Sequence, residues 1–234
     1  MSEKRKHSAA LFRRAIRRSN ELHTEYVDDP VLSESYDRFT RWQFDYMLPF
    51  FSDLLAPEGY AEAVDFIVSD LAGVGVSERD RDIERATPII VRSLPSQALE
   101  LAASAVELNA GVLEFNLAIC RQLLVDGKLP VTISEAEYCI ACRGASSYEE
   151  CMDLVHLAVA LGDGLKTLVR VPLIGMLLRT MRAPAHVAGY GALQEFLETG
   201  YLRFRRISDI EQFLELLHTR MDCIFDRIYR LPIE

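Results

Sequence analysis

Hydrophobic residues recur at spacings of three and four along almost the whole chain, which is the period of an amphipathic α-helix. Near the start, Phe12, Ile16 and Leu22 share one such face, and the longest stretch runs from about residue 96 to residue 125. No stretch alternates apolar and polar residues between hairpin turns, as a strand would. The pattern therefore predicts an all-α protein with eight to ten helices.

Capping residues mark where several of these helices begin. Thr132 or Ser134 is placed to cap a short helix, and Ser146 or Ser147 precedes the next one. Ser208 stands before the last apolar stretch. A hydroxyl at such a position accepts a hydrogen bond from a backbone N–H of the first turn, so these residues predict three helix starts.

Glycine and proline predict further boundaries. Gly162-Asp163-Gly164 predicts an interruption inside an apolar stretch. Pro184 predicts the first turn of a helix, where its fixed φ and missing N–H are tolerated. The small residues beside it, Ala183, Ala185 and Ala188, predict close packing of this helix against a neighbour.

The longest apparent loops are shorter than a dozen residues, which predicts a single compact helical domain. Within it, a basic amphipathic helix over residues 1–30 precedes a helical body over residues 31–234. Residues 1–18 hold seven Lys or Arg and one Glu, a net +6 of the total −9, which leaves −15 on the rest. This helix either contacts an anionic surface or packs on the body with its basic face meeting acids; we expect the packing.

The composition of the 234 residues, with 50% hydrophobic and 26% charged residues, is that of a soluble globular protein. A net charge of −9 makes a nucleic-acid partner unlikely. We find neither the apolar core of a signal peptide nor an uncharged stretch long enough to cross a membrane, so no integral membrane segment is expected. Five cysteines, an odd number, argue against a disulfide framework and favour a cytoplasmic location.

Several stretches, in order and at similar spacing over about residues 36–230, match a pattern known from bacteria. They include Arg41-Trp42-Gln43, the heptad Phe66–Ala72, the run Arg79–Arg85 and, near the end, Arg182-Ala183-Pro184-Ala185. In these stretches the chain resembles the bacterial family named for its FFLEELY motif, whose heptad falls on residues 66–72. The resemblance implies a bacterial origin and a helical fold, and it implies no activity.

A dense charge cluster follows that heptad, formed by Arg79, Asp80, Asp82 and Arg85. On a helix Asp82 lies one turn from both arginines, so its carboxylate can pair with either guanidinium. Such a cluster either binds a carboxylate or phosphate ligand or forms an ion network that ties the helix to its neighbours. We expect the network and keep the four residues as binding candidates.

Arg182 is a further binding candidate because it follows the apolar stretch Leu173–Met181. A guanidinium there is expected to be partly buried and paired with a carboxylate distant in the sequence, with Asp80, Asp82 or Glu107 as candidates. If the pair is structural, Arg182→Met should cost about 3–5 kcal/mol, as expected for one half of a buried pair.

Two residue sets have spacings that occur in metal sites. The first is Cys139-x-x-Cys142 followed by Cys151 and His156, which would give zinc four ligands, although the second half of the set has irregular spacing. Buried or incidental thiols are the alternative that we favour.

The second set consists of two pairs in which an acid precedes a histidine by three residues, Asp153-x-x-His156 and Glu215-x-x-His218. With Glu107 and Glu114 they would resemble the ligands of a di-iron helical bundle. Because 35 acids in the chain make this spacing common by chance, we expect no metal and no cofactor in either set.

No phosphate-binding glycine loop and no nucleophile motif is found. We therefore predict a non-enzymatic protein that binds a protein partner, as an adaptor or regulatory module. The alternative is a metal- or small-molecule-dependent enzyme, or a ligand sensor, with its site between helices. Stoichiometric iron or zinc in pure protein would favour the enzyme.

Overall fold

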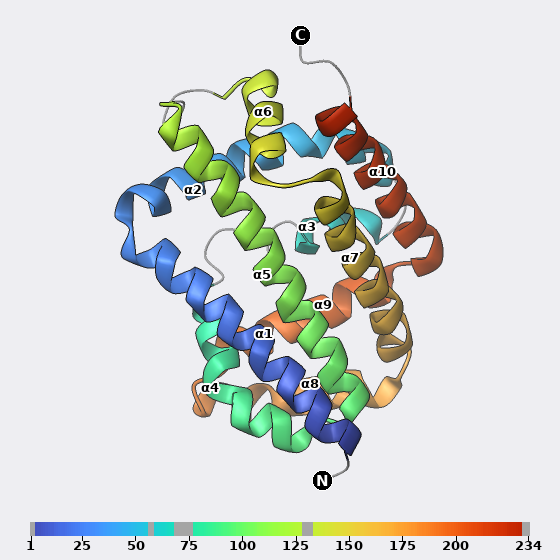
Figure 1. The fold of residues 1–234 in the computed structure, drawn as a ribbon. Coiled ribbons are helices and arrows are strands. Elements are labelled where there is room, and N and C mark those ends of the chain that lie inside the picture. The colour runs from blue at the N-terminus through green and yellow to red at the C-terminus, as the bar shows by residue number, and fades with distance from the viewer. Residues whose placement is uncertain (1–2, 56–58, 68–76, 128–132, 231–234) are drawn as a thin grey trace.

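The structure is a computed structural model that describes residues 3–55, 59–67, 77–127 and 133–230. It does not describe the side chains of Tyr26, Asp53, Leu55, residues 77–81, Ser93 and Pro172. The described part contains ten α-helices, one 3₁₀ helix and no strand, which confirms the predicted all-α class (Figure 1). The elements are α1 (Glu3–Asp28), α2 (Pro30–Met47), η1 (Leu48–Leu55), α3 (Tyr60–Phe66), α4 (Ser77–Ser93), α5 (Ser96–Val125), α6 (Glu135–Ala145), α7 (Tyr148–Val169), α8 (Pro172–Val187), α9 (Gly191–Arg206) and α10 (Ile210–Arg230).

Helix α1 packs along α5, and the two helices run side by side across the front of Figure 1. Phe12 and Ile16 of α1 form a buried apolar cluster with Leu99 of α5. The Ser8 hydroxyl donates a 2.8 Å hydrogen bond to the carboxylate of Glu100. The basic N-terminal helix therefore packs on the body of the protein through Phe12 and Ile16.

Helix α5 is long and apolar enough to cross a membrane by length and composition alone. One such helix is weak evidence, because the central helix of a globular core passes the same test. In this fold α5 contacts α1, α2, α6 and α7, so it is the helix around which the others pack.

The larger apolar core lies beyond α5 and includes residues of α2, α6, α7 and α10. A buried polar group inside it, Tyr138 of α6, accepts a 3.1 Å hydrogen bond from the side-chain amide of Gln43. The same amide donates to the side-chain oxygen of Asn116 at 3.1 Å. Burial raises the pKa of Tyr138 well above its ordinary value. These hydrogen bonds satisfy polar groups that would otherwise be costly to bury.

Two of the predicted helix starts are confirmed. The hydroxyls of Ser134 and Ser147 cap α6 and α7, each in a capping box with the Glu three residues later. At the start of α10 the prediction is wrong, since Asp209 rather than Ser208 accepts the Gln212 N–H, at 3.0 Å. A carboxylate and a hydroxyl are both good caps, and neighbouring polar residues leave the choice open in the sequence.

The predicted interruption at residues 162–164 is wrong, because α7 is continuous from Tyr148 to Val169. A Cβ atom on Gly162 would lie 2.3 Å from the side chain of Leu214, and one on Gly164 would lie 2.4 Å from that of Leu101. These glycines therefore allow close packing of α7 against α10 and α5.

The prediction for Pro184 is also wrong. Helix α8 begins at Pro172 and continues through Pro184 to Val187, so Pro184 lies in its last turns. Proline has no backbone N–H, so Pro184 leaves the carbonyl of Thr180 without its helical hydrogen bond. Thr180 is exposed, and water can bind this carbonyl instead. Ala183 and Ala188 are exposed as well, which contradicts the close packing expected around Pro184.

Candidate functional site

Asp82 and Arg85 connect α4 to the turn between α8 and α9. The Asp82 side chain is only 3% exposed, and its Oδ2 accepts the backbone N–H of Leu193 in the first turn of α9 at 3.2 Å. Its Oδ1 accepts a hydrogen bond from Arg85. Arg85 also donates to the carbonyl of Gly189 at 2.7 Å and lies over the ring of Tyr190. Of the predicted charge cluster, the described residues thus show one ion pair, Asp82 with Arg85, which also bonds the start of α9 and the residue two before it.

Of the other binding candidates, two have side chains that the structure does not describe, and one lies on a different helix. The side chains of Arg79 and Asp80 lie outside the described residues. Glu107 lies on α5, where its carboxylate accepts a hydrogen bond from Arg18 of α1. The binding candidates that sequence reasoning grouped are therefore distributed over separate interfaces of the described structure.

Arg182 is exposed and pairs with Glu198, so the predicted burial and the predicted partners Asp82 and Glu107 are wrong; the side chain of Asp80, the third predicted partner, is not described. Its Nε donates a 3.0 Å hydrogen bond to Glu198, and this bonding holds the pKa of the Glu198 carboxyl below its ordinary value. The pair forms because α8 and α9 pack against each other. Water screens the exposed Arg182 side chain, so this pair should stabilise the fold less than the roughly 3–5 kcal/mol expected for a buried pair.

The cysteine set is divided between the interior and the surface. Cys139 and Cys142 of α6 and Cys151 of α7 are buried, whereas His156 is exposed. Burial raises the pKa of all three thiols. Over the described ranges, no group of three or more His, Cys, Asp or Glu side chains is arranged to hold a metal ion. The structure thus does not bring the four residues together as ligands.

This burial makes a prediction for thiol chemistry. The thiolate is the reactive form, and burial raises the pKa of Cys120 to about 12 and that of Cys142 further. Cys223 is the exposed cysteine. We expect Ellman's reagent at pH 7.5 to modify one thiol rapidly in native protein, and all five after denaturation in guanidinium chloride. Cys223→Ser should remove the rapid phase; a second rapid thiol would contradict the burial of the other four.

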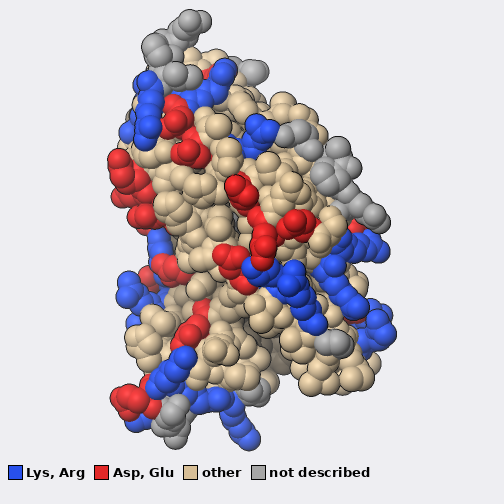
Figure 2. All heavy atoms as spheres, turned by 90° about the vertical axis from the view of Figure 1, so that its right-hand side faces the viewer, with Lys and Arg blue, Asp and Glu red and all other residues tan. Residues whose placement is uncertain are grey.

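The two acid-x-x-His pairs come together on one side of the molecule. Figure 2 views the side on which α7 and α10 lie, and acidic side chains gather near its middle. The rings of His156 on α7 and His218 on α10 stack with centroids 5.4 Å apart. Glu107 and Glu114, which would have completed a di-iron ligand set, instead bind Arg18 at the contact between α5 and α1.

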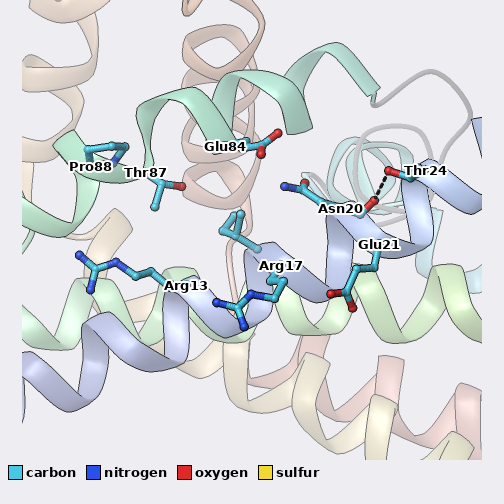
Figure 3. A pocket seen from close by; sticks show the side chains of 9 residues that line it. Arg13, Arg17, Asn20, Glu21, Thr24, Glu84, Thr87 and Pro88 are labelled. Atoms are coloured by element: carbon cyan, nitrogen blue, oxygen red, sulfur yellow. Dashed lines mark hydrogen bonds between the residues drawn. The ribbon is translucent and has the colours of Figure 1, made fainter.

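A groove of about 660 Å³ lies between α1 and α4. It is lined by Arg13, Ile16, Arg17, Asn20, Glu21 and Thr24 of α1 and by Glu84, Thr87 and Pro88 of α4. Figure 3 shows Glu84 facing Asn20 across the groove. Because two arginines and two glutamates share this open groove, its charge favours neither an anionic nor a cationic ligand.

Helix α8 exposes an apolar surface that sequence reasoning assigned to the interior. The exposed fractions of Leu173, Met176 and Leu177 are 62%, 58% and 53%. At 100° per residue these positions fall on one side of the helix together with further exposed, uncharged residues. We call this set the α8 face: Leu173, Met176, Leu177, Thr180, Met181, Pro184 and Val187. The absence of charge at these spacings was visible in the sequence, but the same pattern also fits a helix packed in the core.

The described structure is thus an all-α domain with an exposed apolar helix face. Residues 22–231 match the model of a family described as Domain of unknown function (DUF8198). The chain belongs to this family, and the matched range begins near the end of α1 and extends through α10. No curated protein and no solved structure matches the chain.

Proposed function

We propose that this is a cytoplasmic bacterial protein that acts by binding a protein partner on the α8 face. The exposure of Leu173, Met176, Leu177 and Met181 on one side of α8 is the observation that carries the proposal. The cytoplasmic location is supported by five cysteines without a disulfide. The bacterial origin is supported by the resemblance to the FFLEELY motif family, although most of that heptad, residues 68–72, lies outside the described residues.

The α8 face has the properties of a binding surface. Contiguous apolar surface is uncommon on monomeric proteins, because water disfavours it, and it marks sites that a partner covers. Two of its members, Met176 and Met181, have flexible side chains that adapt to different partner shapes. An apolar helix face that a second helix covers is a common mode of protein recognition.

The charges around the α8 face indicate the chemistry of the partner. Helix α8 contains no Asp or Glu, and Arg179 borders the face. Arg170 and Arg205 line a hollow of about 220 Å³ where α7 ends and α10 begins, near the start of α8. We therefore propose that the partner presents an amphipathic helix whose apolar positions are flanked by Asp or Glu. A second copy of this chain would place arginines against arginines, and the −15 charge outside residues 1–18 disfavours an anionic membrane.

A pair of synthetic helical peptides tests this proposal. Both carry leucines on one face, and one has glutamates beside them where the other has lysines. We expect fluorescence anisotropy to show that the glutamate peptide binds the full chain at least about tenfold more tightly, which corresponds to about 1.4 kcal/mol. Leu177→Glu should weaken that binding at least about tenfold. Val125→Glu, a change at an 83% exposed position on α5, should leave it unchanged.

Three results would overturn the proposal. The first is that neither peptide binds. The second is a dimer in light scattering that Leu177→Glu converts to a monomer, because the α8 face would then hold a second copy. The third is sedimentation with phosphatidylserine vesicles, lost in Leu177→Glu, without peptide binding, because the face would then contact lipid.

A further inference from the structure

The rings of His156 and His218 stack on each other, although the two residues come from different helices. Their centroids are 5.4 Å apart and the ring planes differ by 21°. Helices α7 and α10 run antiparallel, because Tyr148 near the start of α7 bonds Asp222 of α10 and Lys166 near its end bonds Glu211. The two histidines therefore lie between these two contacts, near the middle of the interface of α7 and α10.

A carboxylate stands one turn before each ring. Asp153 precedes His156 and Glu215 precedes His218 by three residues, and both acids are exposed. Because the helices are antiparallel, the two acids lie at opposite ends of the histidine pair. Neither carboxylate accepts a hydrogen bond or forms an ion pair within the described residues, whereas Asp222 accepts one from Tyr148. Both carboxylates are thus available beside the rings.

We propose that His156 and His218 together bind a divalent transition-metal ion of the zinc or nickel class. Two imidazole nitrogens, each about 2.0 Å from one ion in tetrahedral geometry, put the ring centroids roughly 5 Å apart. The observed 5.4 Å is close to this separation, and because the ring planes are nearly parallel, both side chains rotate to direct a ring nitrogen at the same ion. Imidazole selects zinc, nickel, copper or cobalt over magnesium and calcium, which prefer oxygen ligands.

The site holds the ion with two protein ligands, and water occupies the other positions. Over the described ranges, no third His, Cys, Asp or Glu side chain is already in place beside these two. Asp153 and Glu215 increase the local negative charge, which attracts a cation and offsets part of its charge. The ion is thus exchangeable, and it links α7 to α10 when bound.

This proposal does not depend on the α8 face, and metal binding tests it directly. Tag-free full-length protein is titrated with zinc chloride at pH 7.5 by calorimetry. We expect one ion per chain, and His156→Ala and His218→Ala should each weaken binding at least about tenfold. His186→Ala, an exposed histidine on α8, should leave it unchanged. Zinc at ten times its Kd should raise the Tm of the wild type by about 3–6 °C. The same zinc concentration should leave the Tm of His156→Ala and of His218→Ala unchanged.

Further conditions separate this site from other sources of zinc binding. Magnesium chloride should give neither heat nor a change in Tm. Equal zinc affinity in the double variant H156A/H218A would overturn the proposal. So would zinc binding that survives in that variant and disappears in Cys142→Ser, because the buried thiols would then be the ligands.

Discussion

Replacement of Asp82 by alanine is expected to lower the free energy of unfolding by about 3 kcal/mol. The carboxylate is 3% exposed and accepts the Leu193 N–H at the start of α9 and a hydrogen bond from Arg85. A charged hydrogen bond contributes about 1.5–3 kcal/mol, and the loss of a helix cap costs about 1 kcal/mol. Alanine at this position removes both contacts and leaves a helix N–H without its partner.

Thermal denaturation measures this effect, and the Tm should fall by about 6–12 °C for a chain of this length. Glu84→Ala is the matched control, because Glu84 lies on the same helix and is exposed; its effect should stay within about 0.5 kcal/mol. Arg85→Ala should be intermediate, since the guanidinium is 58% exposed but also bonds Gly189. Equal Tm values for Asp82→Ala and Glu84→Ala would show that Asp82 does not cap α9.

Hydrogen exchange gives a local measurement of the same contact. Asp82→Ala should speed exchange in the first turn of α9, and exchange in α6 and α10 should change much less, because neither helix contacts Asp82 through a hydrogen bond. The α8 face belongs to the helix that packs against α9, so peptide binding should weaken only as far as α8 loses its position against α9.

Gly59→Ala is expected to destabilise the protein by about 3–4 kcal/mol. Gly59 precedes α3 with a φ of +84°, which costs any other L-residue energy. An added Cβ would lie 2.4 Å from the backbone oxygen of Arg206 at the end of α9, and backbone atoms cannot rotate away as a side chain does. Both the strained φ and the collision contribute to this loss.

Two other glycines separate these two causes. Gly127 has a φ of +67° and nothing within 4 Å of an added Cβ, so Gly127→Ala should cost only about 1 kcal/mol. Gly144 lies in α6 with open space beside it and an ordinary helical φ, so Gly144→Ala should stabilise by about 0.5–1 kcal/mol. Urea denaturation of the three variants gives the comparison. Equal losses for Gly59→Ala and Gly127→Ala would contradict the backbone collision.

Features with local causes were predictable from the sequence. The capping boxes of Ser134 with Glu137 and Ser147 with Glu150 each lie within four residues, so the same atoms that mark the helix start also form it. The helical period of α5 likewise reflects neighbours on one helix. The continuous helix at residues 162–164 was not predictable in this way, because the close neighbour of Gly162 is Leu214, which is 52 positions away in the sequence.

For the candidate site residues, too, the sequence shows the spacing along one helix but not the contacts between helices. The spacing of Asp153 and His156, like that of Glu215 and His218, is visible in the sequence, because each pair lies on one turn of one helix. That the two histidines face each other depends on the antiparallel packing of α7 and α10. The pairing of Arg182 with Glu198 likewise depends on helix packing, because α8 and α9 lie against each other and bring these two positions into contact.

The sequence by itself determined the helices of this protein, many of their ends and the apolar stripe that each carries, because these depend on residues within about one turn of each other. The tertiary structure alone decided which stripes are covered. The apolar positions of α5 and of the α8 face have the same helical spacing, yet α5 lies at the centre of the fold and Leu173, Met176 and Leu177 are exposed. An apolar stripe predicts only that one side of a helix is buried away from water. The packing of the other helices decides whether this chain or a partner covers that side.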